Sequence, residues 1–198
     1  MNFLAHALLS LNDPEILIGN MISDHVKGKK QYDFSPGIQK GIRLHRAIDQ
    51  FTDFHPITKK ARAKLHPIAG PYAGPLIDVI YDHFLALDEK EEPTAGWHEF
   101  SASVYTELQS RNDILPPGFI RILLYMSEHN WLVNYRHLQL IEASFRGLER
   151  RAKYFTAADE AFQSLLDNYV QFEEYYQEFF PELKQFVSKY QDRISMTE

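Results

Sequence analysis

The sequence predicts an all-α protein, built as a single-domain helical bundle of seven to nine helices. Three observations predict this fold class. Apolar residues recur at helical spacing along most of the chain, strand-like alternation bounded by turn residues is scarce, and no segment repeats with a period of about 20–50 residues. Because no stretch is typical of a linker between two units, we expect residues 1–198 to form one domain.

Proline, glycine and capping residues set the expected helix boundaries in order along the chain. Asp13 precedes Pro14 as a cap for the second helix, Gly28 ends that helix, and Pro56 starts the fourth. Pro181 is expected to kink or divide the last helix. The expected helices cover about residues 2–11, 14–26, 36–51, 56 onwards, 75–87, 99–109, 119–126, 131–155 and 157–189.

Composition places the chain among ordinary soluble proteins. Apolar residues make up 44% of it and charged residues 24%. The absence of cysteine excludes disulfides and thiolate metal sites and favours a reducing compartment. The first residues lack the basic region of a signal peptide, and no apolar run approaches the roughly 20 residues that span a bilayer. We therefore expect a cytoplasmic protein without a membrane partner.

Charge is distributed unevenly along the chain. Residues 25–66 hold ten basic and three acidic residues, a net charge of +7, whereas the rest holds 11 basic and 24 acidic residues, a net charge of −13. This asymmetry indicates an anionic partner beside the N-terminal part, although ordinary solvated helix faces would produce the same pattern. Nucleic acid is not expected as the partner, because the whole chain is acidic, with a pI of about 5.8.

The last quarter of the chain is rich in aromatic residues. Many of them, from Phe155 to Phe186, recur at spacings of three, four and seven and so share one helical face. Such a stripe is typical of core packing, and a groove for a thin flexible ligand is the alternative.

Histidines and aspartates in the first 85 residues or so suggest a metal site. His45 and Asp49 lie four residues apart, so a helix would present both on one face. Imidazoles and carboxylates that converge without thiolates suit Mn²⁺, Fe²⁺, Zn²⁺, Mg²⁺ or Co²⁺, and such ions activate water and neutralise phosphate oxygens. Structural histidines in a non-enzymatic helical interaction module are the alternative. The candidate ligands are His6, Asp24, His45, Asp49, Asp82 and His83.

Two arginines flank the central histidine. Arg43 and Arg46 lie on either side of His45, and guanidinium groups bind phosphate through paired hydrogen bonds. The alternative is a surface ion pair with Asp49 or Asp53. We expect one arginine to bind phosphate and the other to serve the structure.

These motifs also occur together, in a specific order, in a known family. On them the chain resembles the acyl-carrier-protein phosphodiesterases, or ACP hydrolases, a divergent branch of the HD phosphohydrolases. The resemblance covers most of residues 1–137. The segments that carry it are Met1 to His6, Gly19 to Asp24, Val26 to Gly28, Gly41 to Asp49, Thr52-Asp53, His55-Pro56, Asp78-Val79, Tyr81 to Leu85, Trp131 to Val133 and Tyr135-Arg136.

The resemblance implies a fold, a reaction and a metal. It implies an HD-domain-like bundle and a phosphoric diester hydrolase that cleaves the 4′-phosphopantetheine–serine linkage of holo acyl carrier protein. The products would be apo carrier and 4′-phosphopantetheine, and the ion would typically be Mn²⁺. An HD-type nucleotide phosphatase or phosphodiesterase is the alternative enzyme. By matching position the leading site residues are His6, Asp24, His45 and Asp82, followed by Asp49 and His83.

The chain departs from the family pattern at two places. The family more often has an aromatic residue where His25 stands, so no role is carried over to His25. The adjacent pair Asp82-His83 reverses the His-Asp order of the wider superfamily, which bears on which residues hold the metal and on how many ions bind.

Within the implied reaction, the catalytic candidates are Asp24, His83, Arg46 and Arg43. The arginines would offset charge at phosphorus, and His83 or an aspartate such as Asp24 would deliver a proton to the leaving serine. Acyl carrier proteins are strongly acidic, so lysines in the basic segment would hold the carrier. These lysines are Lys27, Lys29, Lys30, Lys59 and Lys60.

Overall fold

The computed structural model describes residues 1–10 and 12–195, with side chains described as far as residue 190. In that part of the chain it contains eleven α-helices, three 3₁₀ helices and no strand, which confirms the all-α prediction and exceeds the expected number of helices. None of these helices is both long and apolar enough to cross a membrane. The elements are α1 (Phe3–Leu8), α2 (Pro14–Ile22), η1 (Ser23–His25), η2 (Gly28–Asp33), α3 (Pro36–Phe54), α4 (Pro56–Ala69), η3 (Gly70–Tyr72), α5 (Ala73–Leu87), α6 (Gly96–Ser110), α7 (Pro117–Glu128), α8 (Trp131–Asn134), α9 (Leu138–Arg151), α10 (Ala158–Asp167) and α11 (Tyr169–Ser195).

Two long expected helices are each divided in the structure. The segment expected as one helix over 131–155 forms α8 and α9, and the segment over 157–189 is divided at Asn168. Asn168 caps the end of α10, and its side-chain amide donates to the carbonyl of Ser164, 2.8 Å away. Pro181 lies inside α11 and does not divide it. Buried Phe180 and Leu183, on either side of Pro181, hold both halves of α11 against the core.

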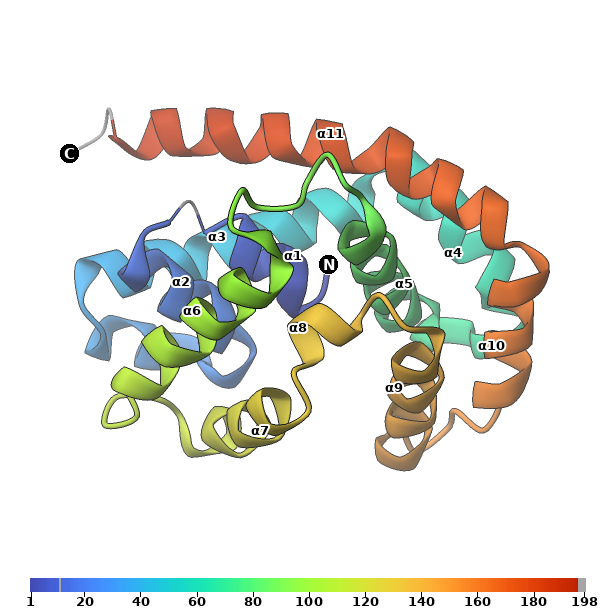
Figure 1. The fold of residues 1–198 in the computed structure, drawn as a ribbon, viewed down its shortest axis with the longest axis horizontal. Helices are drawn as coiled ribbons and strands as arrows, with labels where there is room; N and C mark the ends of the chain where they lie inside the picture. The colour runs from blue at the N-terminus through green and yellow to red at the C-terminus, as the bar shows by residue number, and fades with distance from the viewer. Residues whose placement is uncertain (11, 196–198) are drawn as a thin grey trace.

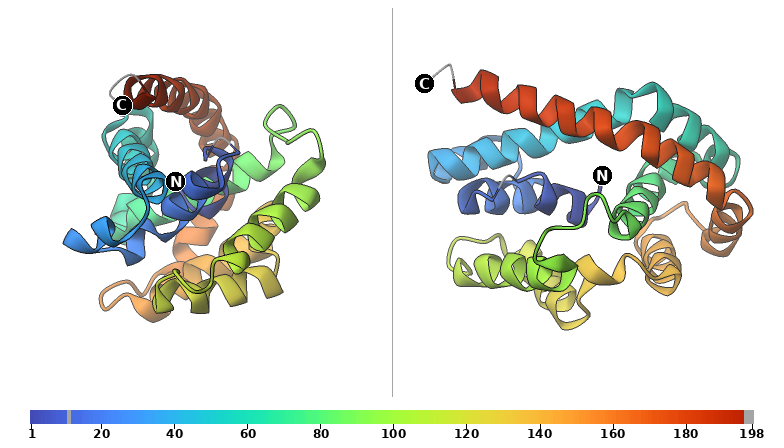
Figure 2. Two further views of the ribbon diagram at one scale, coloured as in Figure 1. Left: turned by 90° about the vertical axis from the view of Figure 1, so that its left-hand side faces the viewer. Right: turned by 45° about the horizontal axis from the view of Figure 1, so that its top comes forward.

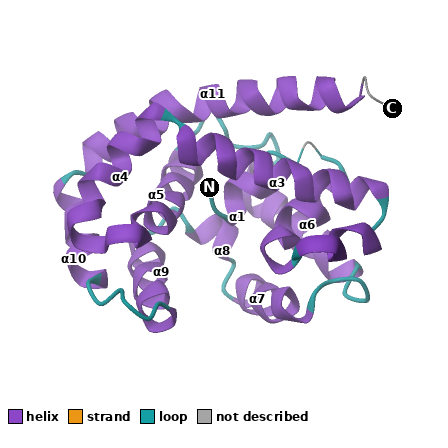
Figure 3. Cartoon of the chain, turned by 180° about the vertical axis from the view of Figure 1, so that it is seen from behind, coloured by secondary structure: helices purple, strands orange, loops and turns teal. Residues whose placement is uncertain are grey.

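The ribbon shows how these helices enclose the core. α11 runs along one side of the molecule beside α3 and α4, while α7, α8 and α9 lie toward the opposite side (Figures 1 and 2). The same arrangement is seen from behind in Figure 3. The aromatic side chains of α11 face inward, since Phe172, Tyr176, Phe179 and Phe180 are all buried. The aromatic stripe is therefore a packing face.

A close crossing between α2 and α3 positions the site described below. A Cβ atom on Gly19 would lie 2.0 Å from the carbonyl oxygen of Ile38, and one on Gly41 would lie 2.2 Å from that of Ile16. Only glycine allows the two backbones to come this close. The crossing brings the main chain of Asn20 within hydrogen-bond distance of the His45 side chain on α3.

The N-terminal segment is anchored to α5. The carboxylate of Asp82 accepts hydrogen bonds from the main-chain N–H groups of Asn2, at 3.1 Å, and Leu4, at 2.7 Å. The ammonium group of Met1 lies 2.9 Å from the carboxylate of Asp78. Asp82 therefore satisfies N–H groups at the start of α1, which are left without partners inside the helix, and fixes the helix that carries His6.

Candidate metal centre and cleft

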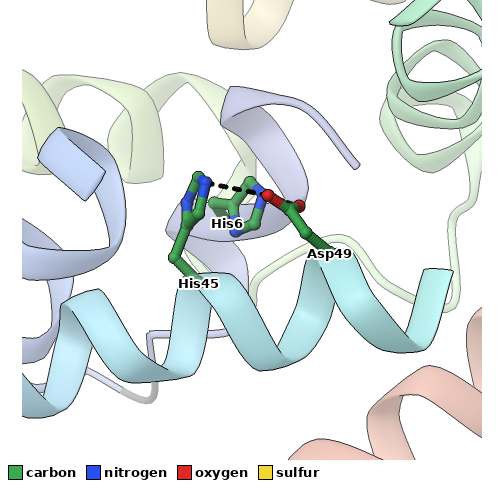
Figure 4. Close-up of side chains that lie close together, drawn as sticks. All are labelled: His6, His45 and Asp49. Atoms are coloured by element: carbon green, nitrogen blue, oxygen red, sulfur yellow. Dashed lines mark ion pairs between the residues drawn. The ribbon is translucent and has the colours of Figure 1, made fainter. Parts of the chain in front are cut away.

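Two histidines and one aspartate from α1 and α3 converge in the structure. His45 and Asp49 lie one turn apart on α3, and His6 reaches them from α1 (Figure 4). The Nε2 atoms of His6 and His45 lie 3.2 and 3.0 Å from the two carboxylate oxygens of Asp49. The imidazole rings stack with their centroids 4.0 Å apart. Each residue offers one ligand atom, and these atoms all lie within 4.8 Å of one another.

Asn20 orients both imidazole rings of this cluster. Its side-chain oxygen lies 2.8 Å from Nδ1 of His6, and its main-chain oxygen lies 2.7 Å from Nδ1 of His45. The Asn20 side-chain nitrogen donates to the carbonyl of His6 and the hydroxyl of Ser10, which fixes the orientation of the amide. Because both oxygens accept, each Nδ1 carries a proton and each Nε2 faces the cluster, the arrangement typical of metal-binding histidines.

The residues present fit a divalent cation. Among the described residues, the buried Nε2 of His6 has no hydrogen-bond donor, and the Asp49 carboxylate 3.2 Å away is itself an acceptor. Burial, together with the neighbouring charge of His45, lowers the pKa of His6 to about 4, so this imidazole is neutral at physiological pH. A buried lone pair without a partner is costly, and a cation is the partner that it lacks. Nitrogen and oxygen donors without thiolates suit ions such as Mn²⁺ or Zn²⁺.

Electrostatics around His45 favour positive charge between the carboxylates. Burial alone would lower the pKa of His45, but hydrogen bonds and charges from Asp24 and Asp49 outweigh burial and raise it to about 9. Burial raises the pKa of Asp49, yet its hydrogen bond with His45, together with the neighbouring His6, brings this pKa well below its usual range. The bond from His45 likewise lowers the pKa of Asp24. A cation here would replace the proton on Nε2 of His45.

Asp24 lies at the solvent-exposed edge of the cluster. Its carboxylate is 3.3 Å from Nε2 of His45, and its side chain is 79% exposed. η1 carries Asp24 and follows α2 directly, so the α2–α3 crossing also positions this residue. Asp24 can therefore reach both the cluster and a ligand arriving from solvent.

The structure does not bring Asp82 and His83 to this cluster. Both oxygens of Asp82 are bonded to the main chain of the N-terminal segment. The ring nitrogens of His83 lie 2.7 Å from the carbonyl of Tyr135 and 2.7 Å from the hydroxyl of Tyr169. Adjacent helical residues point about 100° apart, so Asp82 and His83 contact different neighbours. Among the described residues, the set of ligand atoms that lie within 4.8 Å of one another includes neither Asp82 nor His83.

The arginines and lysines singled out in the sequence lie outside the cluster. Arg43 and Arg46 are exposed, and Arg46 donates to the side chain of Gln31 and the carbonyl of Val26. The five lysines are also exposed and occupy two segments. One segment follows η1, and the other is the first turn of α4. Lys27, Lys29 and Lys30 lie in the first, and Lys59 and Lys60 in the second.

The cluster lies in a large cleft. The cleft has a volume of about 1120 Å³ and extends from His6, His45 and Asp49 to the last turn of α9. α7 and α8 contribute Tyr125 and Trp131 to its walls. Arg150 and Arg151, at the end of α9, also line it and were not among the residues expected from sequence. No local motif links α9 with α1, so only the fold places these arginines at the cleft.

Replacing Asn20 tests its role in orienting the histidines. We expect Asn20→Leu to weaken Mn²⁺ binding by about 10–100-fold, the usual cost of losing a partner behind a metal ligand. The leucine keeps the side-chain volume but removes the acceptor for His6. Equilibrium dialysis against Mn²⁺ measures the effect, and Ser10→Ala, which removes one hydrogen bond from Asn20, is the milder control. Unchanged Mn²⁺ affinity in Asn20→Leu would contradict this role.

Comparison with known proteins identifies similar sequences along nearly the whole chain. Residues 1–183 match the sequence model of the acyl carrier protein phosphodiesterase family. The chain is 31% identical over 185 residues to the acyl carrier protein phosphodiesterase of Photorhabdus laumondii, covering 91% of this chain and 92% of that protein. The corresponding protein of Escherichia coli O45:K1 is 30% identical over 190 residues, covering 96% and 98%. That of Yersinia enterocolitica is 29% identical over 194 residues, covering 98% and 99%. No solved structure matches the chain.

Proposed function

Because the chain belongs to the acyl carrier protein phosphodiesterase family, we propose that it hydrolyses the bond between 4′-phosphopantetheine and a serine of holo acyl carrier protein. The similar proteins are named for phosphodiester hydrolysis on acyl carrier protein. The products would be apo carrier, with a free serine, and 4′-phosphopantetheine. Cleavage of this bond needs water, charge compensation at phosphorus and a proton for the leaving oxygen.

The observation that carries the proposal is the cluster of His6, His45 and Asp49 in the lining of a large cleft. A divalent ion held there, with Mn²⁺ as the proposed ion, would activate water and neutralise phosphate oxygens. The buried, unpartnered Nε2 of His6 supports this donor set. Reconstitution with Mn²⁺, Mg²⁺, Fe²⁺, Zn²⁺ or Co²⁺ after chelation identifies the ion that restores activity.

The chain's own residues have separable roles in this proposal. His6 supplies a neutral nitrogen donor, His45 supplies one once the ion has displaced its Nε2 proton, and Asp49 supplies an ionised oxygen donor between them. Asp24, ionised and exposed beside His45, is placed to bind the ion or to accept a proton from water at the cleft side of the cluster. Main-chain bonds occupy both oxygens of Asp82, so we leave it out of the proposed donor set. The catalytic roles expected for His83, Arg43 and Arg46 stay predictions.

A nucleotide phosphatase or phosphodiesterase is the second candidate. Tyr125 and Trp131 line the cleft and could stack on a base, and Arg150 and Arg151 could bind further phosphates. Parallel assays with nucleotides and with holo carrier separate the two enzymes. A non-enzymatic interaction module would show no ion-dependent hydrolysis of either substrate.

Mass spectrometry of the carrier tests the proposed function directly. Purified protein is incubated with holo acyl carrier protein and Mn²⁺, and the intact mass of the carrier is followed. The expected result is loss of the complete phosphopantetheine group, which leaves an unmodified serine. A carrier whose mass does not change, with any of the five ions, would contradict the proposal.

The basic segments are proposed to hold the acidic carrier, and charge reversal tests this. Lys29→Glu with Lys30→Glu should lower kcat/KM for holo carrier and flatten its dependence on salt, with little effect on kcat. Lys59→Glu with Lys60→Glu should act in the same way but more weakly, because Lys29 and Lys30 lie in η2, close in the chain to η1, which lines the cleft. Lys90→Glu, on an exposed loop, is the control. If neither double variant alters kcat/KM at low salt, the carrier docks elsewhere.

A further inference from the structure

One face of α9 lines the cleft from the first turn of the helix to the last. The opposite face packs inward through the buried side chains of Ile141 and Phe145, and α9 rests on α5 and α10. The cleft face is formed by residues three, four and seven positions apart. They are Gln139, Leu140, Ala143, Ser144, Gly147 and Leu148. Across the cleft stand α7 and α8 (Figure 1).

The walls of this part of the cleft combine apolar surface with neutral polar groups. Trp131, Leu140 and Leu148 supply apolar surface, while Gln139 and Ser144 supply an amide and a hydroxyl. Within the described residues, the side chains of Gln139 and Ser144 make no hydrogen bond, so their polar groups are available to a ligand. Away from Arg150 and Arg151 at the C-terminal end of α9, such walls suit an uncharged ligand that carries both methylene and amide groups.

The cleft is larger than a phosphodiester group requires. Its volume of about 1120 Å³ exceeds the roughly 300–1,000 Å³ of clefts that hold drug-sized molecules. The cluster of His6, His45 and Asp49 supplies only a small part of its lining. A ligand that fills the cleft must therefore extend from the scissile phosphate along α9.

We propose that the cleft between α9 and the Tyr125–Trp131 wall binds the pantetheine chain of the substrate, and this rests on the proposed function. Pantetheine is thin and uncharged and contains two amides, a hydroxyl and a dimethyl-substituted carbon. Its amides match Gln139 and Ser144, and its apolar carbons match Trp131 and Leu140. Serine and pantetheine are joined to phosphorus through different oxygens, so pantetheine can occupy the cleft while the carrier body stays outside it.

A bulky residue on the cleft face of α9 tests the proposal. Ala143 is exposed and lines the cleft, so Ala143→Trp fills the cleft without disturbing the core. We expect kcat/KM for holo carrier to fall by about 100-fold, the scale of loss when a substrate is displaced from its productive position. Hydrolysis of bis(4-nitrophenyl) phosphate, which needs only the metal cluster, is expected to be unchanged. Leu124→Trp, on α7 and outside the cleft, is the matched control and should leave both rates unchanged.

The outcomes separate this inference from the proposed function. If wild-type protein does not hydrolyse holo carrier, the proposed function fails. If wild-type protein hydrolyses it and Ala143→Trp does so equally well, the pantetheine site is overturned. Should Ala143→Trp lose both activities, the double variant Gln139→Ala with Ser144→Ala decides. In this double variant, inhibition by free 4′-phosphopantetheine should be about tenfold weaker than in the wild type. Unchanged inhibition would overturn the proposal.

Discussion

His45→Ala is expected to abolish hydrolysis of holo acyl carrier protein. His45 is the centre of the cluster, because its ring stacks on His6 and its Nε2 lies 3.0 Å from Asp49 and 3.3 Å from Asp24. Alanine removes a nitrogen donor and the contact that positions both carboxylates. The loss in kcat/KM should exceed about 1000-fold, the upper end for a single electrostatic contact in an active site.

Two measurements make this result specific to the cluster. Initial rates are recorded over a wide range of Mn²⁺ concentration, and excess ion should not restore the variant. Gln50→Ala, on an exposed position of the same helix, controls for damage to α3 and should retain wild-type rates. A folded His45→Ala variant that hydrolyses the carrier at the wild-type rate would exclude the cluster as the catalytic centre.

Asp82→Ala is expected to have its largest effect on stability. Asp82 is fully buried, and alanine would leave the N–H groups of Asn2 and Leu4 without their acceptor. A buried donor that loses its partner costs roughly 1–3 kcal/mol, so the free energy of unfolding should fall by about 3 kcal/mol. Equilibrium unfolding in urea measures the change, and Asp82→Asn, which keeps one acceptor oxygen, should lose less.

The same pair of variants distinguishes an anchoring residue from a metal ligand. If Asp82 anchors α1, Asp82→Asn binds Mn²⁺ with an affinity close to that of the wild type. If Asp82 were a ligand, Asp82→Asn would lose Mn²⁺ binding while its unfolding free energy changed little. The second pattern would restore the role that family resemblance implied for Asp82.

The parts of the fold predicted from sequence are those with local causes. Asp13 caps α2 through hydrogen bonds to the N–H groups of Glu15 and Ile16, and Pro56 starts α4, as expected. The break between α8 and α9 has a tertiary cause, because the carbonyl of Tyr135 in that break bonds with His83 of α5. Sequence patterns do not reveal such a contact. The likeness to HD-domain proteins stays a prediction.

In the candidate site, too, the features predicted from sequence are those with local causes. The four-residue spacing of His45 and Asp49 placed them together on one helix face, and the structure brings His6 to them. The sequence makes Asp82 and His83 candidate ligands, but in the structure Asp82 accepts bonds from the N-terminal segment and His83 contacts Tyr135 and Tyr169. Asn20 and the cleft face of α9 have no recognisable local pattern, since their roles depend on helices that meet only in the folded chain.

Anomalous diffraction from crystals soaked in Mn²⁺ tests the metal centre most directly. Data collected at the manganese absorption edge locate the ion without reference to activity. The expected result is a peak between Nε2 of His6, Nε2 of His45 and the carboxylate of Asp49. A peak beside Asp82 and His83, or a soaked crystal with no peak at the cluster, would contradict the proposed centre.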